Sequence, residues 1–193
     1  MISVDGLTVE FGDRALFKDI SFQINEKDRI ALMGKNGAGK TTFINILLRL
    51  IKEDSGSVVS NVSVKKEVGV VFQEDYFPKE ATVSDLIKLQ ASFFHKKVNV
   101  DEELKIMGLE KEKFQKVGTL SGGQKRKLSF LLATLHDPKL LILDEPINGL
   151  DPIGIAEVRS FIRELCDARG KTILISSHIL SEISLLADDI GII

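Results

Sequence analysis

The octapeptide GKNGAGKT, residues 34–41, is the stretch of sequence that decides the fold. It follows the apolar run RIALM and precedes TFINILLRL, which has the apolar spacing of an amphipathic helix. A glycine-rich loop between a strand and a helix turns backbone N–H groups and the positive end of the helix dipole toward bound phosphate. The pattern GxxxxGK[ST] therefore predicts nucleotide binding, with Lys40 at the terminal phosphates and the Thr41 hydroxyl on Mg²⁺. A turn that only caps a helix is the alternative, and the flanking strand and helix argue against it.

The composition is that of one ordinary globular domain. The chain has 193 residues, of which 44% are hydrophobic and 28% charged, so it can form one core but not two. A net charge of -2 offers no general attraction to polyanions, and no nucleic acid partner is expected. The single cysteine, Cys166, excludes an intrachain disulfide and is expected to be a buried side chain in a reducing compartment. No apolar run reaches the roughly 18 residues of a membrane-spanning helix, and the N-terminus lacks a signal-peptide pattern.

The order of apolar runs predicts an α/β fold. We expect strands near residues 2–11, 20–24, 29–33, 56–59, 68–72, 140–143 and 172–176, and helices near 152–169 and 179–187. Fully apolar strands that alternate with helices indicate a parallel sheet covered on both faces. The segment from Thr82 to about Lys116 has helical spacing and no apolar strand, which predicts a helical lobe inserted after Phe72, over about residues 74–137. Ligands are expected beyond the carboxyl ends of the parallel strands.

Polar side chains follow three of these strands. Asp144 and Glu145 end LLILDE, His178 follows TILISS, and Gln73 follows VGVVF. Consecutive strand residues point to opposite faces, so Asp144 is expected to hold Mg²⁺ through water while Glu145 orients or deprotonates the water that attacks the γ-phosphate. His178 can donate to the γ-phosphate, and the amide oxygen of Gln73 can reach Mg²⁺ or its water. Taken singly, the acids could cap a helix, the histidine could be structural and the glutamine could be solvated.

A second helix N-terminus also has the features of an anion site. In LSGGQKRKLSFLLATL, Ser121 can cap a helix whose apolar residues, Leu128, Leu131, Leu132 and Leu135, follow three and four spacing. A serine followed by two glycines also offers a hydroxyl and unhindered N–H groups to an anion. One nucleotide does not obviously need both this segment and the phosphate loop.

The order of these motifs resembles the nucleotide-binding domain of an ABC transporter over essentially the whole chain. GKNGAGKT is similar to the Walker A motif of that family, Gln73 to its Q-loop, LSGGQ to its signature, LLILDE to its Walker B motif, NGLD to its D-loop and His178 to its switch histidine. Phe11 matches the aromatic position that stacks on adenine in that family, although a phenylalanine after a strand more often lies in the core. The resemblance implies a P-loop NTPase fold, with an ABC-type ATPase core, an antiparallel β subdomain and an inserted α-helical subdomain.

The resemblance also implies ATP and Mg²⁺ as cofactors, and an active site shared between two subunits. In that family two domains pack head to tail around two ATP molecules, so that each signature closes on the phosphates held by the other subunit. The implied catalytic residues are Glu145, His178, Lys40 and Gln73, and the implied Mg²⁺ ligands are Thr41, Gln73 and Asp144. The implied nucleotide contacts are Phe11, Gly34, Lys35, Asn36, Gly37, Ala38, Gly39, Lys40, Thr41, Thr42, Ser121, Gly122, Gly123, Gln124 and Asp151.

The partners implied by the resemblance are the transmembrane subunits of a transporter, together with a second copy of the chain or a paired ABC subunit. Docking is expected near residues 74–85, which would place the protein in the cytoplasm at the inner face of the cell membrane. The segments GLDPIGIAEVRSF and SSHILSEISLLADDIGII are most similar to bacterial exporter cassettes of the drug and bacteriocin-resistance type. The alternatives are a soluble ABC ATPase acting on ribosomes or DNA, and a truncated module that binds nucleotide without hydrolysing it.

Three features depart from the family pattern. In the family, Gln-Arg commonly follows the signature one residue on, and the residues at this place here are Lys125, Arg126 and Lys127. At Ile147 the family usually has Thr or Ser. We interpret residues 1–193 as a single ABC ATP-binding domain, with the usual C-terminal strand hairpin and helix expected to be missing after DDIGII. An exposed edge strand is the expected consequence.

Overall fold

The computed structural model describes residues 1–11 and 14–193, with the exception of the side chains of Phe11 and Arg14. The expected stacking of Phe11 on adenine therefore lies outside the described residues. Among the residues that are described, no helix combines the length and the apolar character needed to cross a membrane.

The strands form two sheets, as the sequence predicts. The antiparallel sheet has the order β2-β1-β4, and the five-stranded sheet has the order β5-β6-β7-β3-β8, with every neighbouring pair parallel. Their bounds are β1 Ile2–Phe11, β2 Arg14–Ile24, β3 Arg29–Met33, β4 Ser55–Ser60, β5 Val68–Val71, β6 Leu140–Asp144, β7 Thr172–Ser177 and β8 Asp189–Ile192.

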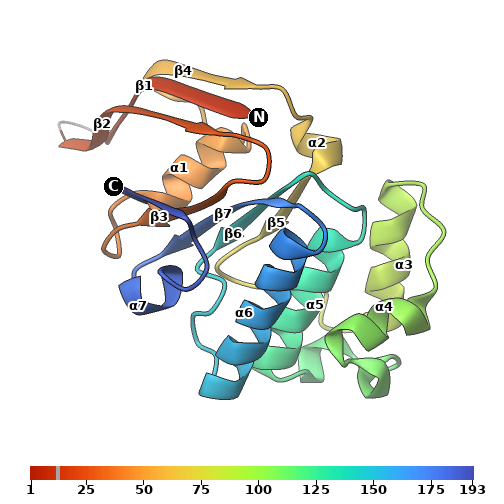
Figure 1. Ribbon diagram of the computed structural model, residues 1–193. Coiled ribbons are helices and arrows are strands. Elements are labelled where there is room, and N and C mark those ends of the chain that lie inside the picture. Colours follow the sequence, from red (N-terminus) through yellow and green to blue (C-terminus); the bar gives the residue numbers. More distant parts are fainter. Residues whose placement is uncertain (12–13) are drawn as a thin grey trace.

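The helices cover both faces of the parallel sheet (Figure 1). Their bounds are α1 Lys40–Leu47, α2 Val64–Glu67, α3 Val83–Phe93, α4 Val100–Met107, α5 Gly122–Thr134, α6 Pro152–Asp167 and α7 Leu180–Ile183, with 3₁₀ turns at Glu110–Glu112 and Val117–Thr119. Helix α1 lies between the two sheets, while α5 and α6 lie side by side on the opposite face (Figure 1). Helices α3, α4 and α5 all fall between β5 and β6, which is where the insertion was expected.

Strands β6 and β7 are buried along their whole length because both of their faces are covered. Leu140, Ile142 and Leu174 pack in the core shared with α1 and the antiparallel sheet. Leu141 and Leu143 point to the other face, into the core formed by α3 to α6. This two-sided burial explains why the two strands read as continuous apolar runs in the sequence.

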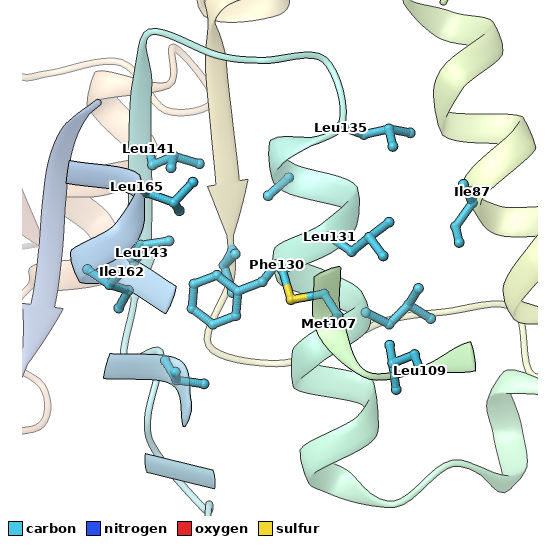
Figure 2. Close-up of a cluster of buried hydrophobic side chains, with 14 of the residues drawn as sticks. Ile87, Met107, Leu109, Phe130, Leu131, Leu135, Leu141, Leu143, Ile162 and Leu165 are labelled. Atoms are coloured by element: carbon cyan, nitrogen blue, oxygen red, sulfur yellow. The ribbon is translucent and has the colours of Figure 1, made fainter. Parts of the chain in front are cut away.

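Helix α5 joins the parallel sheet to the inserted helices. Phe130 packs on the side of the strands and α6, whereas Leu131 and Leu135 point toward Ile87 of α3 (Figure 2). Phe130 is 1% exposed and meets Phe161 of α6 edge-on, with ring centroids 5.8 Å apart. The helix is therefore fixed on two sides by one continuous core.

The sequence-based boundaries are wrong at two places. Strand β2 begins at Arg14, six residues before the predicted start, because its first half pairs with the irregular end of β1. Helix α7 spans only Leu180–Ile183 of the nine residues predicted. The last residues form β8, which pairs with β3 as an edge strand whose residues are all exposed, as expected.

Truncation of Phe130 is expected to cost about 3–5 kcal/mol in the free energy of unfolding, because the cavity would open where α5, α6 and the sheet meet. Urea denaturation of Phe130→Ala measures this cost. The matched control is Phe93→Ala, which removes a ring that is 67% exposed and should change stability by less than about 0.5 kcal/mol. Equal losses in the two variants would contradict the described packing of α5.

The stability of the fold is expected to fall on acidification because of His136. Burial lowers the pKa of His136 below its ordinary value of 6.5, and its ring stacks on Phe94 with centroids 4.0 Å apart. Since the unfolded chain takes up the proton more readily, the stability that the neutral ring provides is fully present above about pH 6.5 and is lost as the pH falls. Urea midpoints across this range should shift less in His136→Phe, whereas the exposed-site variant His95→Asn should follow the wild type. An unchanged pH slope in His136→Phe would contradict this assignment.

Candidate nucleotide-binding site

The glycine-rich loop connects β3 to α1 and leaves the N-terminus of α1 open. Gly37 and Gly39 have φ angles of 83° and 101°, which are left-handed conformations that glycine adopts without strain. Gly39 is the N-cap of α1, and no side chain in the described part of the chain accepts a hydrogen bond from a backbone N–H of the first turn. The orphan N–H groups of that turn are therefore available to an anion.

A pocket of about 420 Å³ opens in front of this loop. Its lining residues are Leu16, Asn36, Gly37, Gly39, Lys40, Thr41, Thr42, Gln73 and Glu145. The structure thus brings most of the predicted phosphate-loop residues together with Gln73 and Glu145, although both of these lie more than 30 residues beyond the loop in the sequence. Leu16 of β2 was not predicted, because its place in the pocket depends on how the antiparallel sheet packs on the loop.

Lys40 is buried with its ammonium group turned back over the loop. Its Nζ donates to the carbonyl oxygens of Gly34 and Lys35, at 2.7 and 3.2 Å, and lies 3.3 Å from Oε1 of Glu145. The Lys40 and Glu145 side chains are 6% and 5% exposed, so neither charge is balanced by solvent. A buried charge requires such a partner, and the phosphates of a nucleotide could replace it at Lys40.

Asp144 lies between the loop and the adjacent strand. The Thr41 hydroxyl donates to Oδ2 of Asp144 at 2.8 Å, and the Ser176 hydroxyl donates to Oδ1. Asp144 and Ser176 are paired across β6 and β7, and both are fully buried. No role was predicted for Ser176 from the sequence, although a serine at the end of an apolar strand that pairs with the strand ending in Asp144 is the signal that could have identified it.

Glu145 follows β6 in a left-handed backbone conformation with a φ of 48°, which is uncommon for a residue other than glycine. Its N–H donates to the carbonyl oxygen of Ser176 at 3.2 Å and to the hydroxyl of Ser176 at 3.0 Å. The expectation that Asp144 and Glu145 point to opposite faces is therefore wrong, because strand alternation stops at Asp144. Both carboxylates face the phosphate loop, one through Thr41 and the other through Lys40.

His178 contacts the second oxygen of Glu145. Its Nδ1 lies 2.9 Å from Oε2, and its side chain is 34% exposed. Oε1 of Glu145 is buried and has no hydrogen-bond partner among the described residues; its contact with Lys40 is purely ionic. One carboxylate oxygen is thus held by His178, and the other is open to a further donor.

The donor set fits Mg²⁺ bound together with a nucleotide. Within the described parts of the chain there is no cluster of three or more His, Cys, Asp or Glu side chains that would form a metal site by itself. Mg²⁺ prefers oxygen ligands and commonly combines one or two protein oxygens with water and substrate phosphates. The Thr41 hydroxyl, the Asp144 carboxylate and the amide oxygen of Gln73 are oxygen ligands of this kind. Thr41 and Gln73 line the pocket, and buried Asp144 lies next to it, in contact with Thr41.

The signature residues form a second pocket of about 400 Å³, and within the described residues the two pockets have no lining residue in common. Ser121 caps α5 by accepting from the N–H of Gln124, whose side chain accepts from the N–H of Ser121 in return. Added Cβ atoms at Gly122 and Gly123 would meet nothing within 4 Å, so the backbone there is open. The predicted residues that line this pocket are Ser121, Gly122, Gly123, Gln124 and Asp151, and the carboxylate of Asp151 caps α6 at Gly154.

The sequence-predicted site residues therefore divide between two places on the chain. The phosphate-loop residues, Gln73, Asp144, Glu145 and His178 gather at the first pocket, and the signature residues and Asp151 gather at the second. One chain alone does not bring the signature to the phosphate loop.

Comparison with known proteins finds similarity to one protein family. Residues 17–148 match the family model described as ABC transporter. The chain is 40% identical over 203 residues to the bacitracin transport ATP-binding protein BcrA of Bacillus licheniformis, and it spans 66% of that protein's length. It is 37% identical over 204 residues to the lantibiotic transport ATP-binding protein SrtF of Streptococcus pyogenes, covering 86% of it; both alignments include the whole chain.

A solved structure shares the fold. The ATP-binding cassette MJ0796, described as a dimer in a post-hydrolysis state bound to ADP and Pi, superposes with a TM-score of 0.83 at 22% identity, over 96% of this chain and 91% of the other. These matches identify the family as well as the fold: the chain belongs to the ABC transporter family, with relatives among the ATP-binding proteins of bacitracin and lantibiotic transport.

Proposed function

We propose that the chain is the ATP-binding and ATP-hydrolysing subunit of an ABC transporter, which drives transport through ATP-dependent pairing with a second cassette. The observation that carries this proposal is the placement of Glu145, a buried carboxylate held between Lys40 and His178 at the mouth of the phosphate-loop pocket. The names of its relatives, which are transport ATP-binding proteins, support the same function.

The phosphate-binding role falls to the loop and to the first turn of α1. The uncapped N–H groups beyond Gly39 would donate to the phosphate oxygens, and Lys40 would exchange its loop carbonyls for the terminal phosphates. Thr41 and Asp144 would hold Mg²⁺, with Gln73 as a further oxygen ligand. Bound Mg²⁺ neutralises charge on the phosphates during transfer.

The proposed general base is Glu145, whose oxygens reach the pocket. A carboxylate there can accept a proton from water that is in line with the γ-phosphate. The contact from His178 Nδ1 fixes the orientation of that carboxylate and leaves the other ring nitrogen free to face the γ-phosphate, to which it can donate when both ring nitrogens carry a hydrogen. Because Glu145 and His178 are already held in contact, they do not need to rearrange when charge develops on the phosphate.

The signature pocket is proposed to complete the active site of a partner cassette. Ser121, Gly122 and Gly123 offer a hydroxyl and open backbone to an anion, but they lie away from the chain's own phosphate loop. A head-to-tail pair would bring each signature, together with Asp151, to the other cassette's nucleotide, and the related cassette MJ0796 is described as a dimer. The partner is a second copy of this chain or a paired ABC subunit.

The transport role requires membrane partners. We propose that transmembrane subunits dock near residues 74–85, and that the protein works at the inner face of the cell membrane. The rival roles, on ribosomes or DNA, are not favoured by relatives named for bacitracin and lantibiotic transport. Binding to a purified transmembrane subunit, with nucleic acid as the comparison, tests this part of the proposal.

Glu145→Gln should lower ATP turnover by about 100-fold or more while leaving ATP binding intact, because the amide keeps the shape of the side chain but cannot accept the proton. Phosphate release and binding of a fluorescent ATP analogue measure the two effects. The control Glu164→Gln alters an exposed glutamate near the end of α6 and should behave as wild type. Wild-type turnover in Glu145→Gln would contradict the proposed base.

Ser176→Ala should raise the Mg²⁺ concentration needed for half-maximal turnover by about 10-fold or more, because Asp144 loses the hydroxyl that orients it. The matched control is Ser177→Ala, which removes a neighbouring buried hydroxyl that accepts from Ile179 and does not touch Asp144. Titration of ATPase activity with Mg²⁺ in both variants checks this. A shift of equal size in Ser177→Ala would assign the effect to general loosening of β7.

A further inference from the structure

Arg126 is a buried arginine just behind the signature on α5, and the proposed function assigns it no task. Its side chain is 6% exposed. Arginine is rarely buried unless its donors are used by fixed partners. In sequence, Arg126 belonged only to the departure from the family pattern at residues 125–127.

The guanidinium group of Arg126 holds two consecutive backbone carbonyls. Nη1 donates to the carbonyl oxygen of Phe72 and Nη2 to that of Gln73, both at 2.7 Å. These are the two residues that directly follow β5, where the chain leaves the sheet. A planar fork that binds two acceptors at once fixes both the position and the orientation of the backbone it holds.

Asp75 completes the same arrangement from the loop side. Its Oδ1 lies 3.4 Å from Nη1 of Arg126, and it also accepts from the hydroxyl of Ser129, one turn further along α5. The side chain of Asp75 is 13% exposed, so the ion pair is largely removed from solvent. The loop from Phe72 to Asp75 is therefore attached to α5 at three successive points.

Helix α5 is a rigid attachment for this loop. Ser121 caps its first turn, and Arg126 lies in the next turn. Since an α-helix rises about 1.5 Å per residue, the two residues are close together along its axis. Phe130 and Leu131 hold the same helix against the sheet and α3 (Figure 2). Helix α5 thus connects Ser121 at its N-terminus with the backbone of Gln73, which Arg126 holds at the side of the helix.

We propose that Arg126 is the positioning residue for Gln73, which it holds in a fixed place relative to the signature residues of the same chain. The side chain of Gln73 is exposed and lines the phosphate-loop pocket, so its own packing does not fix it. Displacement of α5 when the signature meets a partner's nucleotide is passed to Gln73 through the fork. The inference rests on the proposed function, since it concerns how the two pockets of one cassette are linked.

Two substitutions separate this role from that of a stabilising ion pair. Arg126→Lys keeps the positive charge beside Asp75 but replaces the planar fork with a point charge that cannot hold both carbonyls in the same way. Asp75→Asn removes the ion pair but leaves both carbonyl contacts in place. A positioning role predicts a functional loss in the first variant only, whereas an ion-pair role predicts a loss in the second.

Amide hydrogen exchange on the full chain is the first readout. In Arg126→Lys, exchange of the amides of residues 72–77 should rise by about 10-fold or more, with that of β6 unchanged, and Asp75→Asn should stay closer to wild type. Wild-type protection of the loop in Arg126→Lys would overturn the proposal. So would an equal rise in both variants, because the two carbonyl contacts, which Asp75→Asn leaves in place, would then not be what holds the loop.

Steady-state kinetics is the second readout. The value of kcat should fall by roughly 10- to 100-fold in Arg126→Lys with little change in KM for ATP, because the phosphate loop is intact and only Gln73 is displaced. A rise in KM with kcat unchanged would overturn the positioning role. If Arg126→Lys does not fold, as judged by its thermal melt, the double variant Arg126→Gln with Asp75→Asn leaves no charge unpaired and is compared with Asp75→Asn alone by the same criteria.

The two readouts also separate this inference from the proposed function. Absence of ATP turnover in the wild-type chain would defeat the proposed function, while hydrogen exchange of the loop would still decide whether Arg126 holds it. Normal turnover in the wild type with unaltered loop exchange and kcat in Arg126→Lys would leave the proposed function standing and defeat the inference.

Discussion

A buried lysine and two buried carboxylates meet at one edge of the parallel sheet, and the rest of the site follows from the need to pair them. Lys40 lies against Glu145, and Asp144 accepts from Thr41 and Ser176. Such charges are costly away from water unless each has partners in good geometry. The left-handed backbone of Glu145 is part of the same constraint, because it turns this carboxylate toward the loop instead of the opposite face of the sheet.

The proposed pairing of two cassettes depends on two separate pockets that lie on one chain. The phosphate loop belongs to β3 and α1, and the signature belongs to the start of α5, which the core holds against the sheet and the inserted helices. The pockets share no lining residue in the described chain, and we propose that the signature of a second cassette completes the site of a nucleotide bound at the phosphate loop. In such a pair ATP would control opening and closing, because a nucleotide held between two surfaces binds better than a nucleotide held by one.

Much of the fold could be predicted from the sequence, since the phosphate loop, the apolar strands and the capped helices are local patterns. Ser121 was correctly expected to cap α5. A helical insertion was expected after Phe72, and α3, α4 and α5 follow β5 in the chain. Contacts between distant segments were not predictable in this way. Ser176 contacts Asp144 only because β7 lies beside β6, and Arg126 contacts Gln73 only because α5 lies beside the loop after β5. The turn at Glu145 was missed because strand alternation was continued one residue too far.

The rate of ATP hydrolysis per chain, measured against protein concentration at saturating Mg²⁺ and ATP, tests the shared site most directly. The separation of the two pockets predicts a rate per chain that rises with concentration and levels off once most cassettes are paired. A rate per chain that is constant from dilute monomer upward would show that one chain hydrolyses ATP without a partner's signature, and would contradict the proposed division of the active site.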